Sequence, residues 1–263
     1  MKNHLLLESY CKTLKLPTVW REFGRLAREC AQKDRGYAAF LQSLLELEVQ
    51  NRAAKATERR LKEAGFPTEK ELAAFDFAAA PRVNKKLALE LAQGEFVRRR
   101  ESVVLVGPPG VGKTHLAIAL GREACRRGFR VKYHAVTDLA TAYVEAREAR
   151  TVTRLERAIE RRDLIILDEL GYVPLDRTAA EHLFGFFSKC YERTSLIVTT
   201  NLPFSQWPQV FGGDERMTGA LLDRLAHRVH VMEMKGESYR LTGGRKGREK
   251  AGDARKGGDD LTE

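Results

Sequence analysis

The first quarter of the chain carries apolar side chains at the spacing of an α-helix. Between residues 41 and 49, three leucines and a valine recur at helical spacing, while Glu46 and Glu48 lie off that stripe. The helical pattern continues to Lys62, and a Gly-Phe-Pro triplet at 65–67 predicts its end. A preceding helix is expected after a proline at 17, with four buried side chains: Val19, Trp20, Phe23 and Leu26. Residues 1–70 are therefore predicted to form a small all-helical domain.

From residue 75 the pattern changes to short β-branched runs that alternate with helical stretches. The runs are continuously apolar, as expected of strands that are covered on both faces. Strands are predicted at 102–106, 130–134, 164–167, 196–200 and 229–232. Helices are predicted at 112–127, 137–149, 151–161, 178–191 and 215–226. This alternation predicts an α/β domain with a parallel sheet over residues 71–242. The tail at 243–263 has almost no apolar residues and is expected to be disordered.

The composition narrows the class of protein. Lys and Arg outnumber Asp and Glu by 46 to 36, and the net charge of +10 favours a polyanionic partner. The four cysteines form no C-x-x-C pair, so we expect reduced structural thiols at Cys11, Cys30, Cys125 and Cys190. No run of eighteen apolar residues occurs, so no membrane span is expected. The N-terminus lacks the hydrophobic stretch of a signal peptide, which predicts a cytoplasmic protein.

Residues 107–114 read Gly-Pro-Pro-Gly-Val-Gly-Lys-Thr, the G-x-x-x-x-G-K-T pattern of a phosphate-binding loop, or P-loop. The loop lies between a predicted strand and a predicted helix, which is the context that a P-loop requires. Its glycines let successive backbone N–H groups point at phosphate oxygens, and the helix adds its positive N-terminal end. Lys113 is expected to contact the β and γ phosphates, and the Thr114 hydroxyl to ligate magnesium. Nucleotide binding is assigned to Gly107, Pro108, Pro109, Gly110, Val111, Gly112, Lys113, Thr114 and His115, the last without a catalytic role.

Hydrolysis of ATP requires polar groups beyond the P-loop. Asp168 and Glu169 follow the apolar run 164–167, at the carboxyl end of a strand, where open parallel sheets bind ligands. We expect Asp168 to hold magnesium through water, and Glu169 to polarise the attacking water as general base. Asn201 ends another apolar strand and is suited to hydrogen-bond the γ-phosphate or the lytic water. A turn asparagine before Leu-Pro fits the same position and stays open.

The P-loop, the Asp-Glu pair and the strand-terminal asparagine, in this order, resemble the AAA+ ATPases. Over about residues 10–242 the chain more narrowly resembles the IstB-like ATP-binding proteins, which are helper subunits of certain bacterial insertion sequences. This narrower resemblance is carried by the segments 14–17, 41–67, 75–77, 167–172, 199–204, 221–225 and 236–240. The residues after Asn201 are too few for a separate lid domain, so no C-terminal lid is expected, in agreement with the IstB-like and helicase-loader branch.

The resemblance implies a sheet order of 5-1-4-3-2 and a DNA-bound homo-oligomer with ATP between neighbouring subunits. It also implies action on a partner transposase. In such assemblies an arginine from the next subunit stabilises the charge of the transition state. The segment 221–225 makes Arg224 the first choice for this role and Arg228 the second. An ordinary surface arginine, paired with Asp223 or solvated, is the alternative.

Basic residues on the long N-terminal helix form a predicted ridge for duplex DNA. Their steps of three and four positions place them along one helix face: Arg52, Lys55, Arg59 and Lys62, with Arg60 alongside. Phosphate contacts from such a ridge give salt-sensitive binding with little reading of sequence. A solvated face with Glu58 and Glu63 as local partners is the alternative. Lys85, Lys86 and the arginines at 98–100 are weaker candidates.

Four functions fit these patterns to different degrees. The leading hypothesis is a DNA-activated ATPase that assists a transposase. The nearest rival, a DnaC-like replicative helicase loader, shares the same lidless core and differs in its N-terminal domain and partner. A small-molecule kinase would leave the basic ridge without a role, and Glu169 disfavours a nucleotide switch that does not hydrolyse. His134 and His230 are interpreted as packing or edge residues.

Overall fold

The computed structural model describes residues 2–226 and 228–235, and the chain separates into two compact units, Met1–Arg59 and Arg60–Glu263. The N-terminal unit contains α1 (Lys2–Thr13), α2 (Pro17–Gln32) and most of α3 (Tyr37–Ala64), whose last turn belongs to the C-terminal unit. The predicted helical region and the end of its long helix are confirmed: Gly65 follows α3 with a φ of 69°. Among the described helices, none combines the length and the apolar character of a membrane span.

Within the N-terminal unit, a carboxylate of α3 caps the start of α2. Glu48 is only 3% exposed and accepts hydrogen bonds from the backbone N–H groups of Thr18 at 2.8 Å and Val19 at 3.1 Å. These donors lie in the first turn of α2, where N–H groups have no partner inside the helix. Burial raises the pKa of Glu48, but the hydrogen bonds from Val19, Thr18 and Arg52 outweigh it and hold the pKa below its usual value.

This cap corrects the predicted apolar stripe. Leu44 is buried, whereas Leu41, Leu45 and Val49 are largely exposed, and Glu48 lies in the interior instead of outside the stripe. The buried face of α3 is therefore set by the donors of α2 as much as by apolar side chains. In α2, Leu26 is buried as predicted, while Val19, Trp20 and Phe23 are half-buried, with the last two rings stacked at 5.3 Å.

The C-terminal unit is built on a five-stranded parallel sheet in the order β2-β3-β4-β1-β5, which confirms the implied order. The strands are β1 (Ser102–Val106), β2 (Val131–Ala135), β3 (Leu164–Leu170), β4 (Ser195–Thr200) and β5 (Val229–Glu233). Neighbouring side chains of one strand enter different layers: Val103 and Leu105 belong to one hydrophobic cluster, and Val104 belongs to the other. Both faces of the sheet are therefore covered, as the continuous apolar runs predicted.

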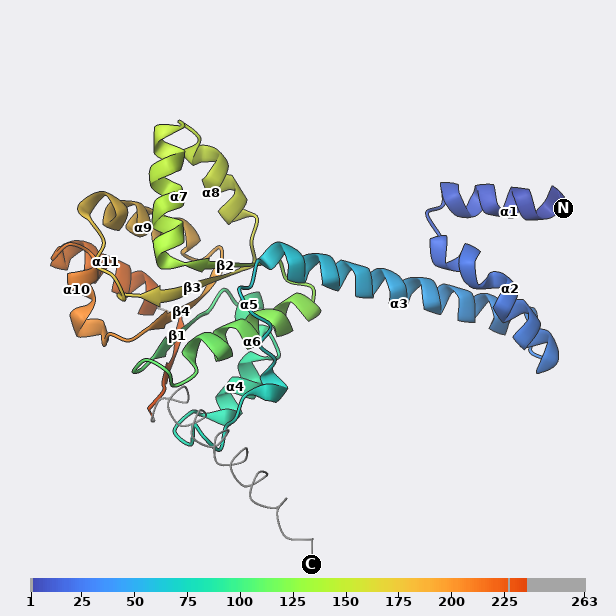
Figure 1. Ribbon diagram of the computed structural model, residues 1–263, viewed down its shortest axis with the longest axis horizontal. Helices are drawn as coiled ribbons and strands as arrows, with labels where there is room; N and C mark the ends of the chain where they lie inside the picture. The colour runs from blue at the N-terminus through green and yellow to red at the C-terminus, as the bar shows by residue number, and fades with distance from the viewer. Residues whose placement is uncertain (1, 227, 236–263) are drawn as a thin grey trace, which may run out of the picture. The chain divides into compact units, whose positions relative to one another are not determined.

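Helices cover both faces of this sheet (Figure 1). They are α4 (Lys85–Leu91), α5 (Glu95–Arg98), α6 (Lys113–Arg126), α7 (Val136–Glu148), α8 (Val152–Glu160), α9 (Arg177–Cys190), α10 (Trp207–Val210) and α11 (Glu215–Ala226), with 3-10 turns η1 (Leu72–Ala74) and η2 (Phe204–Gln206). Every predicted helix and strand of this unit is present, with ends that differ by a few residues. The predicted tail at 243–263 and the segment 236–240 lie outside the described residues.

One strand end differs from its prediction in a way that matters for the site. β3 does not end at Leu167 but continues to Leu170, and its register with β4 shifts between these two residues. Asp168 and Glu169 therefore occupy an irregularity inside a paired strand, and Glu169 has a φ of 67°. Such bulges redirect side chains beside functional sites.

Candidate functional site

The P-loop connects β1 to α6 and is closed in by backbone from β5. A side chain on Gly107 would place its Cβ 2.0 Å from the carbonyl oxygen of Met234, the residue after β5. Gly110 and Gly112 have φ values of 84° and 96°, which other residues rarely adopt. The glycine spacing of the motif is therefore required by close approach at one position and by backbone conformation at two others.

Lys113 begins α6 and folds back over the loop. Its ammonium donates to the carbonyl oxygens of Gly107 at 2.6 Å and Pro108 at 2.7 Å. Both acceptors belong to the P-loop, so the positive charge is held beside the backbone that is expected to cradle phosphates.

Asp168 is 2% exposed and accepts hydrogen bonds from hydroxyls on three separate elements. One carboxylate oxygen accepts hydrogen bonds from Thr114 Oγ1 of α6 at 3.0 Å and from Thr199 Oγ1 of β4 at 2.5 Å. The other oxygen accepts a hydrogen bond from the Tyr133 hydroxyl of β2 at 2.7 Å. Burial, together with this bond to Asp168, raises the pKa of Tyr133 far above its usual value, so the phenol stays a proton donor. The carboxylate is thus fixed in position by three neighbouring elements.

The pair formed by Thr114 and Asp168 fits a magnesium ion. Mg²⁺ prefers hard oxygen ligands in an octahedron at about 2.1 Å, where adjacent ligands lie about 3.0 Å apart, and the two side-chain oxygens are separated by 3.0 Å. In the described part of the chain, no group of three or more His, Cys, Asp or Glu side chains could hold a metal. That agrees with a site in which phosphates and water complete the coordination, as is usual for Mg²⁺.

Glu169 is exposed, and its backbone is held by the same threonine that contacts Asp168. The N–H of Glu169 donates to Thr199 Oγ1 at 2.9 Å, while that hydroxyl donates its own hydrogen to Asp168. Thr199 therefore fixes both acidic residues. Neither Thr199 nor Tyr133 was selected from the sequence, because each lies in a strand whose apolar pattern marks it only as sheet.

Asn201 follows β4 and lines the same cavity as the P-loop. Its Oδ1 atom is buried and has no hydrogen-bond partner among the described residues. The turn after β4 uses a different side chain, since the N–H of Leu202 donates to Thr200 Oγ1 at 3.0 Å. These contacts favour a polar role for Asn201 toward a ligand over the turn role that the sequence left open.

These residues meet in a cavity of about 780 Å³, within the usual range for small-molecule sites. Its polar wall comes from the P-loop, Asp168, Glu169 and Asn201, and its other wall from the segment 67–83. Phe75 packs edge-on against His115 with ring centroids 5.3 Å apart, and His115 Nε2 lies 3.1 Å from the carbonyl oxygen of Glu71. His115 thus anchors this wall beside the loop, which accounts for its place in the motif without a catalytic role.

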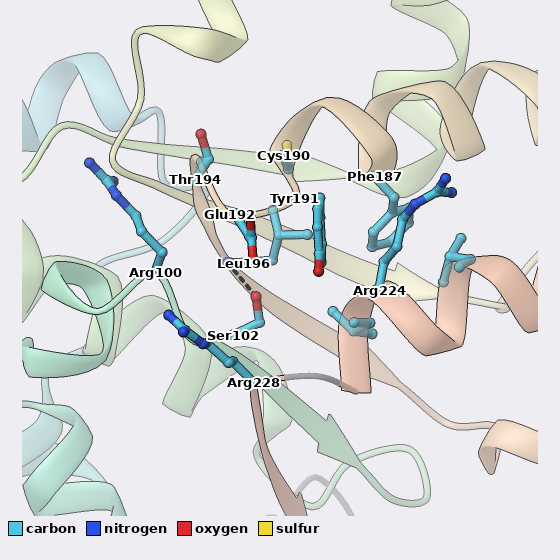
Figure 2. A pocket seen from close by; sticks show the side chains of 12 residues that line it. Arg100, Ser102, Phe187, Cys190, Tyr191, Glu192, Thr194, Leu196, Arg224 and Arg228 are labelled. Atoms are coloured by element: carbon cyan, nitrogen blue, oxygen red, sulfur yellow. Dashed lines mark hydrogen bonds between the residues drawn. The ribbon is translucent and has the colours of Figure 1, made fainter.

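The two candidate trans arginines line a different pocket (Figure 2), which lies beside the amino ends of β1 and β4, whereas the P-loop follows the carboxyl end of β1. Arg224 lies near the end of α11, where its guanidinium sits 5.2 Å from the Phe184 ring centroid and donates to Ser188 Oγ at 3.2 Å. Arg228 precedes β5, and its carbonyl oxygen accepts the N–H of Ser102, the first residue of β1. The alternative pairing of Arg224 with Asp223 is absent from the ion pairs of the described residues.

The predicted DNA ridge on α3 is divided by its contacts. Arg52 pairs with Glu48 at 2.9 Å and also donates to the carbonyl oxygen of Lys15. Arg60 is half-buried and donates to the carbonyl oxygen of Cys125 at 2.8 Å. The remaining three side chains are exposed, namely Lys55, Arg59 and Lys62, and Arg52 is also exposed despite its contacts. Of the five predicted ridge residues, Arg60 is therefore the one that is half-buried.

Solved structures share the fold of the C-terminal unit. The replication initiator DnaA bound to AMPPCP and single-stranded DNA has a TM-score of 0.53 at 23% identity, covering 66% of this chain and 52% of DnaA. DnaI has a TM-score of 0.54 at 18% identity, covering 68% of this chain and 94% of DnaI. At these identities the likeness shows a shared fold and nothing of partners.

Comparison of sequences identifies the family of the chain as well as its fold. A protein named as an ATP-binding protein of insertion sequence IS21 in Pseudomonas aeruginosa is 39% identical over 240 residues, covering 91% of this chain and 90% of its own. One named for insertion sequence IS5376 in Geobacillus stearothermophilus is 34% identical over 235 residues, covering 89% and 93%. The model of the IstB-like ATP binding proteins matches residues 9–247. The chain therefore belongs to the family of IstB-like ATP binding proteins.

Proposed function

We propose that this chain is an ATPase that assembles on duplex DNA in an ATP-dependent manner and assists a transposase. The observation that carries the proposal is the gathering of Thr114, Asp168, Glu169 and Asn201 around the P-loop in one cavity. A nucleotide switch would need only the phosphate-binding residues, whereas this site adds an exposed carboxylate and an unpartnered amide oxygen.

Each side chain has a distinct task in hydrolysis. Bound ATP with Mg²⁺ supplies the reactive γ-phosphoryl group and neutralises part of its charge. Lys113 adds a positive charge to the β and γ phosphates, and Thr114 with Asp168 would hold the metal. Glu169 orients a water molecule and accepts its proton, while Asn201 accepts a hydrogen bond from that water or contacts the γ-phosphate.

The arginine that completes the site comes, in this proposal, from a neighbouring copy. β1 separates Gly107 from the pocket of Arg224 by five residues of strand, about 17 Å at 3.3 Å per residue. That exceeds the reach of a side chain, so Arg224 cannot contact the nucleotide of its own subunit. Arg228 shares the same pocket and stays the second choice.

Duplex DNA and a transposase are inferred from charge and from the relatives. The net charge of +10 and the exposed Lys55, Arg59 and Lys62 favour a polyanion. The relatives are named for insertion sequences, and transposition is the reaction that such elements require. A helicase loader is less well supported, because the family match begins at residue 9 and so includes the N-terminal helices, where helpers and loaders differ. We place the protein in the cytoplasm because its proposed partners are DNA and a transposase.

The test is ATP hydrolysis with and without duplex DNA, at low and moderate salt. We expect binding to DNA that weakens as salt rises, and turnover that DNA changes. If duplex DNA neither binds nor alters turnover, the proposal fails. Replacing Glu169→Gln should trap ATP-bound assemblies on DNA, whereas Glu192→Gln, an exposed acid far from the P-loop that also has a positive φ, should not.

Shared sites are tested by mixing subunits. Arg224→Ala and Lys113→Ala should each abolish hydrolysis, and an equal mixture should recover part of it, because the first variant keeps its nucleotide site and the second keeps its arginine. A mixture as inactive as its parts would exclude Arg224 from the site of a neighbour. Repeating the mixture with Arg228→Ala decides between the two arginines.

A further inference from the structure

A stripe of arginines runs along one face of α8. Arg154, Arg157 and Arg161 step by three and four positions and share one face of the helix and its C-cap, and Arg150 lies two residues before the helix with a φ of 56°. All four are exposed and line one shallow cavity of about 560 Å³ with two threonines and an alanine. No acidic side chain contributes to this cavity. We call this surface the arginine stripe.

The other faces of α8 explain why the stripe points outward. Ile159 is buried, and Val152 and Leu155 pack beside it against the hydrophobic cluster on this side of the sheet. Glu156 pairs with Lys189 of α9 at 2.5 Å, away from the stripe. The apolar side chains and Glu156 are thus used inside the unit, and the arginines are left on the surface together with Glu160.

The stripe gathers several arginines without counter-charges on one surface. Some other exposed arginines of the chain meet carboxylates, as Arg25 does with Glu29 and Arg130 with Asp163. Within residues 2–226 and 228–235, the four arginines of the stripe have neither a hydrogen bond nor an ion pair of their side chains. Like charges at helical spacing of three and four residues repel one another and destabilise a helix. A bound polyanion would remove this repulsion.

We propose that the arginine stripe binds the phosphate backbone of duplex DNA and is a second DNA contact, separate from the ridge on α3. The inference rests on the proposed function, because it names a further surface for the same DNA. From Arg154 to Arg161 the helix axis advances about 10 Å, which matches the rise of about three base pairs. Guanidinium groups form paired hydrogen bonds with phosphate, so the stripe holds DNA without reading its sequence.

The place of the stripe in the C-terminal unit also suits a shared duplex. Arg162, which follows the stripe, lies 3.8 Å from Glu63 on the last turn of α3, measured between Nη1 and Oε2. That turn belongs to the same unit and carries exposed Lys62, the end of the predicted ridge. The C-terminal end of the stripe therefore lies near the last turn of α3, and one DNA backbone can contact both.

The test replaces three stripe residues by the neutral helix former glutamine, as Arg154→Gln, Arg157→Gln and Arg161→Gln together. The apolar face of α8 is untouched and like-charge repulsion is removed, so thermal stability should not fall, and DNA-free ATP hydrolysis should remain at the wild-type value. Binding to a mixed-sequence duplex, measured with a non-hydrolysable ATP analogue, should weaken on the order of 100-fold at about 0.1 M salt. The slope of log affinity against log salt should fall by about 2 to 3, since each lost phosphate contact removes about 0.9.

A matched control removes the same charge elsewhere, as Arg177→Gln, Arg193→Gln and Arg216→Gln, three exposed arginines away from α8. An equal loss of affinity in this control would show an effect of net charge and overturn the inference. An unchanged salt slope in the stripe variant would overturn the inference too. The inference would also be overturned if the stripe variant bound duplex DNA normally but lost binding to single-stranded RNA or to an acidic peptide. Wild-type protein that binds no duplex DNA would instead refute the proposed function itself, and the stripe with it.

Discussion

Thr199 offers the sharpest test of how the site is held together. Its hydroxyl accepts the N–H of Glu169 at 2.9 Å and donates to Asp168 at 2.5 Å, so Thr199→Val removes both contacts while keeping the side-chain shape. Tyr133→Phe is the matched control, because it also removes one donor from Asp168 but leaves the backbone of Glu169 untouched. The pair of variants separates the two effects.

The expected magnitude follows from the backbone of Glu169. A residue other than glycine at a φ of 67° costs about 1–2 kcal/mol, and a hydrogen bond contributes about 0.5–1.5 kcal/mol. These are comparable, so losing the bond to Thr199 lets Glu169 relax toward ordinary backbone. A shift of about 1 Å in a catalytic group can lower the rate by about 100-fold. We therefore expect kcat of Thr199→Val to fall about 10- to 100-fold.

Steady-state ATP hydrolysis at saturating ATP and magnesium measures this effect. Both variants should need more magnesium, because Asp168 loses one donor in each, and both should lose about 1.5–3 kcal/mol of unfolding free energy. Only Thr199→Val should have a reduced kcat at saturation, and Thr199→Ser should restore it by returning the hydroxyl. An equal kcat in Thr199→Val and Tyr133→Phe would refute the positioning role of Thr199.

Three further predictions concern other parts of the chain. Burial and nearby Lys132 lower the pKa of His134 from 6.5 to about 4, so below pH 6.5 the unfolded chain binds a proton that the folded chain does not. The free energy of unfolding should therefore fall by about 2 kcal/mol between pH 7 and pH 5. Chemical denaturation of His134→Gln should not show this loss of stability. Gly107→Ala should abolish nucleotide binding, measured by calorimetry, because its Cβ would meet the Met234 carbonyl oxygen at 2.0 Å, whereas Gly185→Ala on α9, with nothing within 4 Å, should bind normally. Glu48→Ala should lower the melting of the N-terminal helices by circular dichroism, at a cost of about 1–3 kcal/mol, since two N–H groups of α2 lose their acceptor, while exposed Glu46→Ala should change little.

The sequence predicted those structural features that depend on residues close together in the chain. Continuous apolar runs marked the strands because both sheet faces are covered, and the P-loop glycines are required by backbone conformation within the loop itself. Asp168 and Glu169 were found because they directly follow such a run. The strand order came from family resemblance, since periodicity does not report which strands are neighbours.

The parts that the sequence missed depend on distant partners. Glu48 contacts Thr18 across 30 positions, and Asp168 contacts Tyr133 across 35. The period of a single helix cannot show that a carboxylate on it serves as the cap of another helix, so the buried face of α3 was predicted wrongly. The bulge in β3 likewise arises from pairing with β4, and Thr199 acts only once that pairing exists.

The positions of the nucleotide site and Arg224 constrain the form of the proposed assembly. They lie at opposite ends of the parallel strands, so a contact that brings them together joins two different surfaces and is heterologous. Such contacts repeat into rings or open filaments instead of closing as a symmetric pair. In an equal random mixture of Arg224→Ala and Lys113→Ala, about one contact in four joins an intact nucleotide site to an intact arginine. Recovery of about a quarter of wild-type hydrolysis would therefore support a repeating heterologous assembly, whereas recovery near one half would indicate obligatory pairing of unlike subunits.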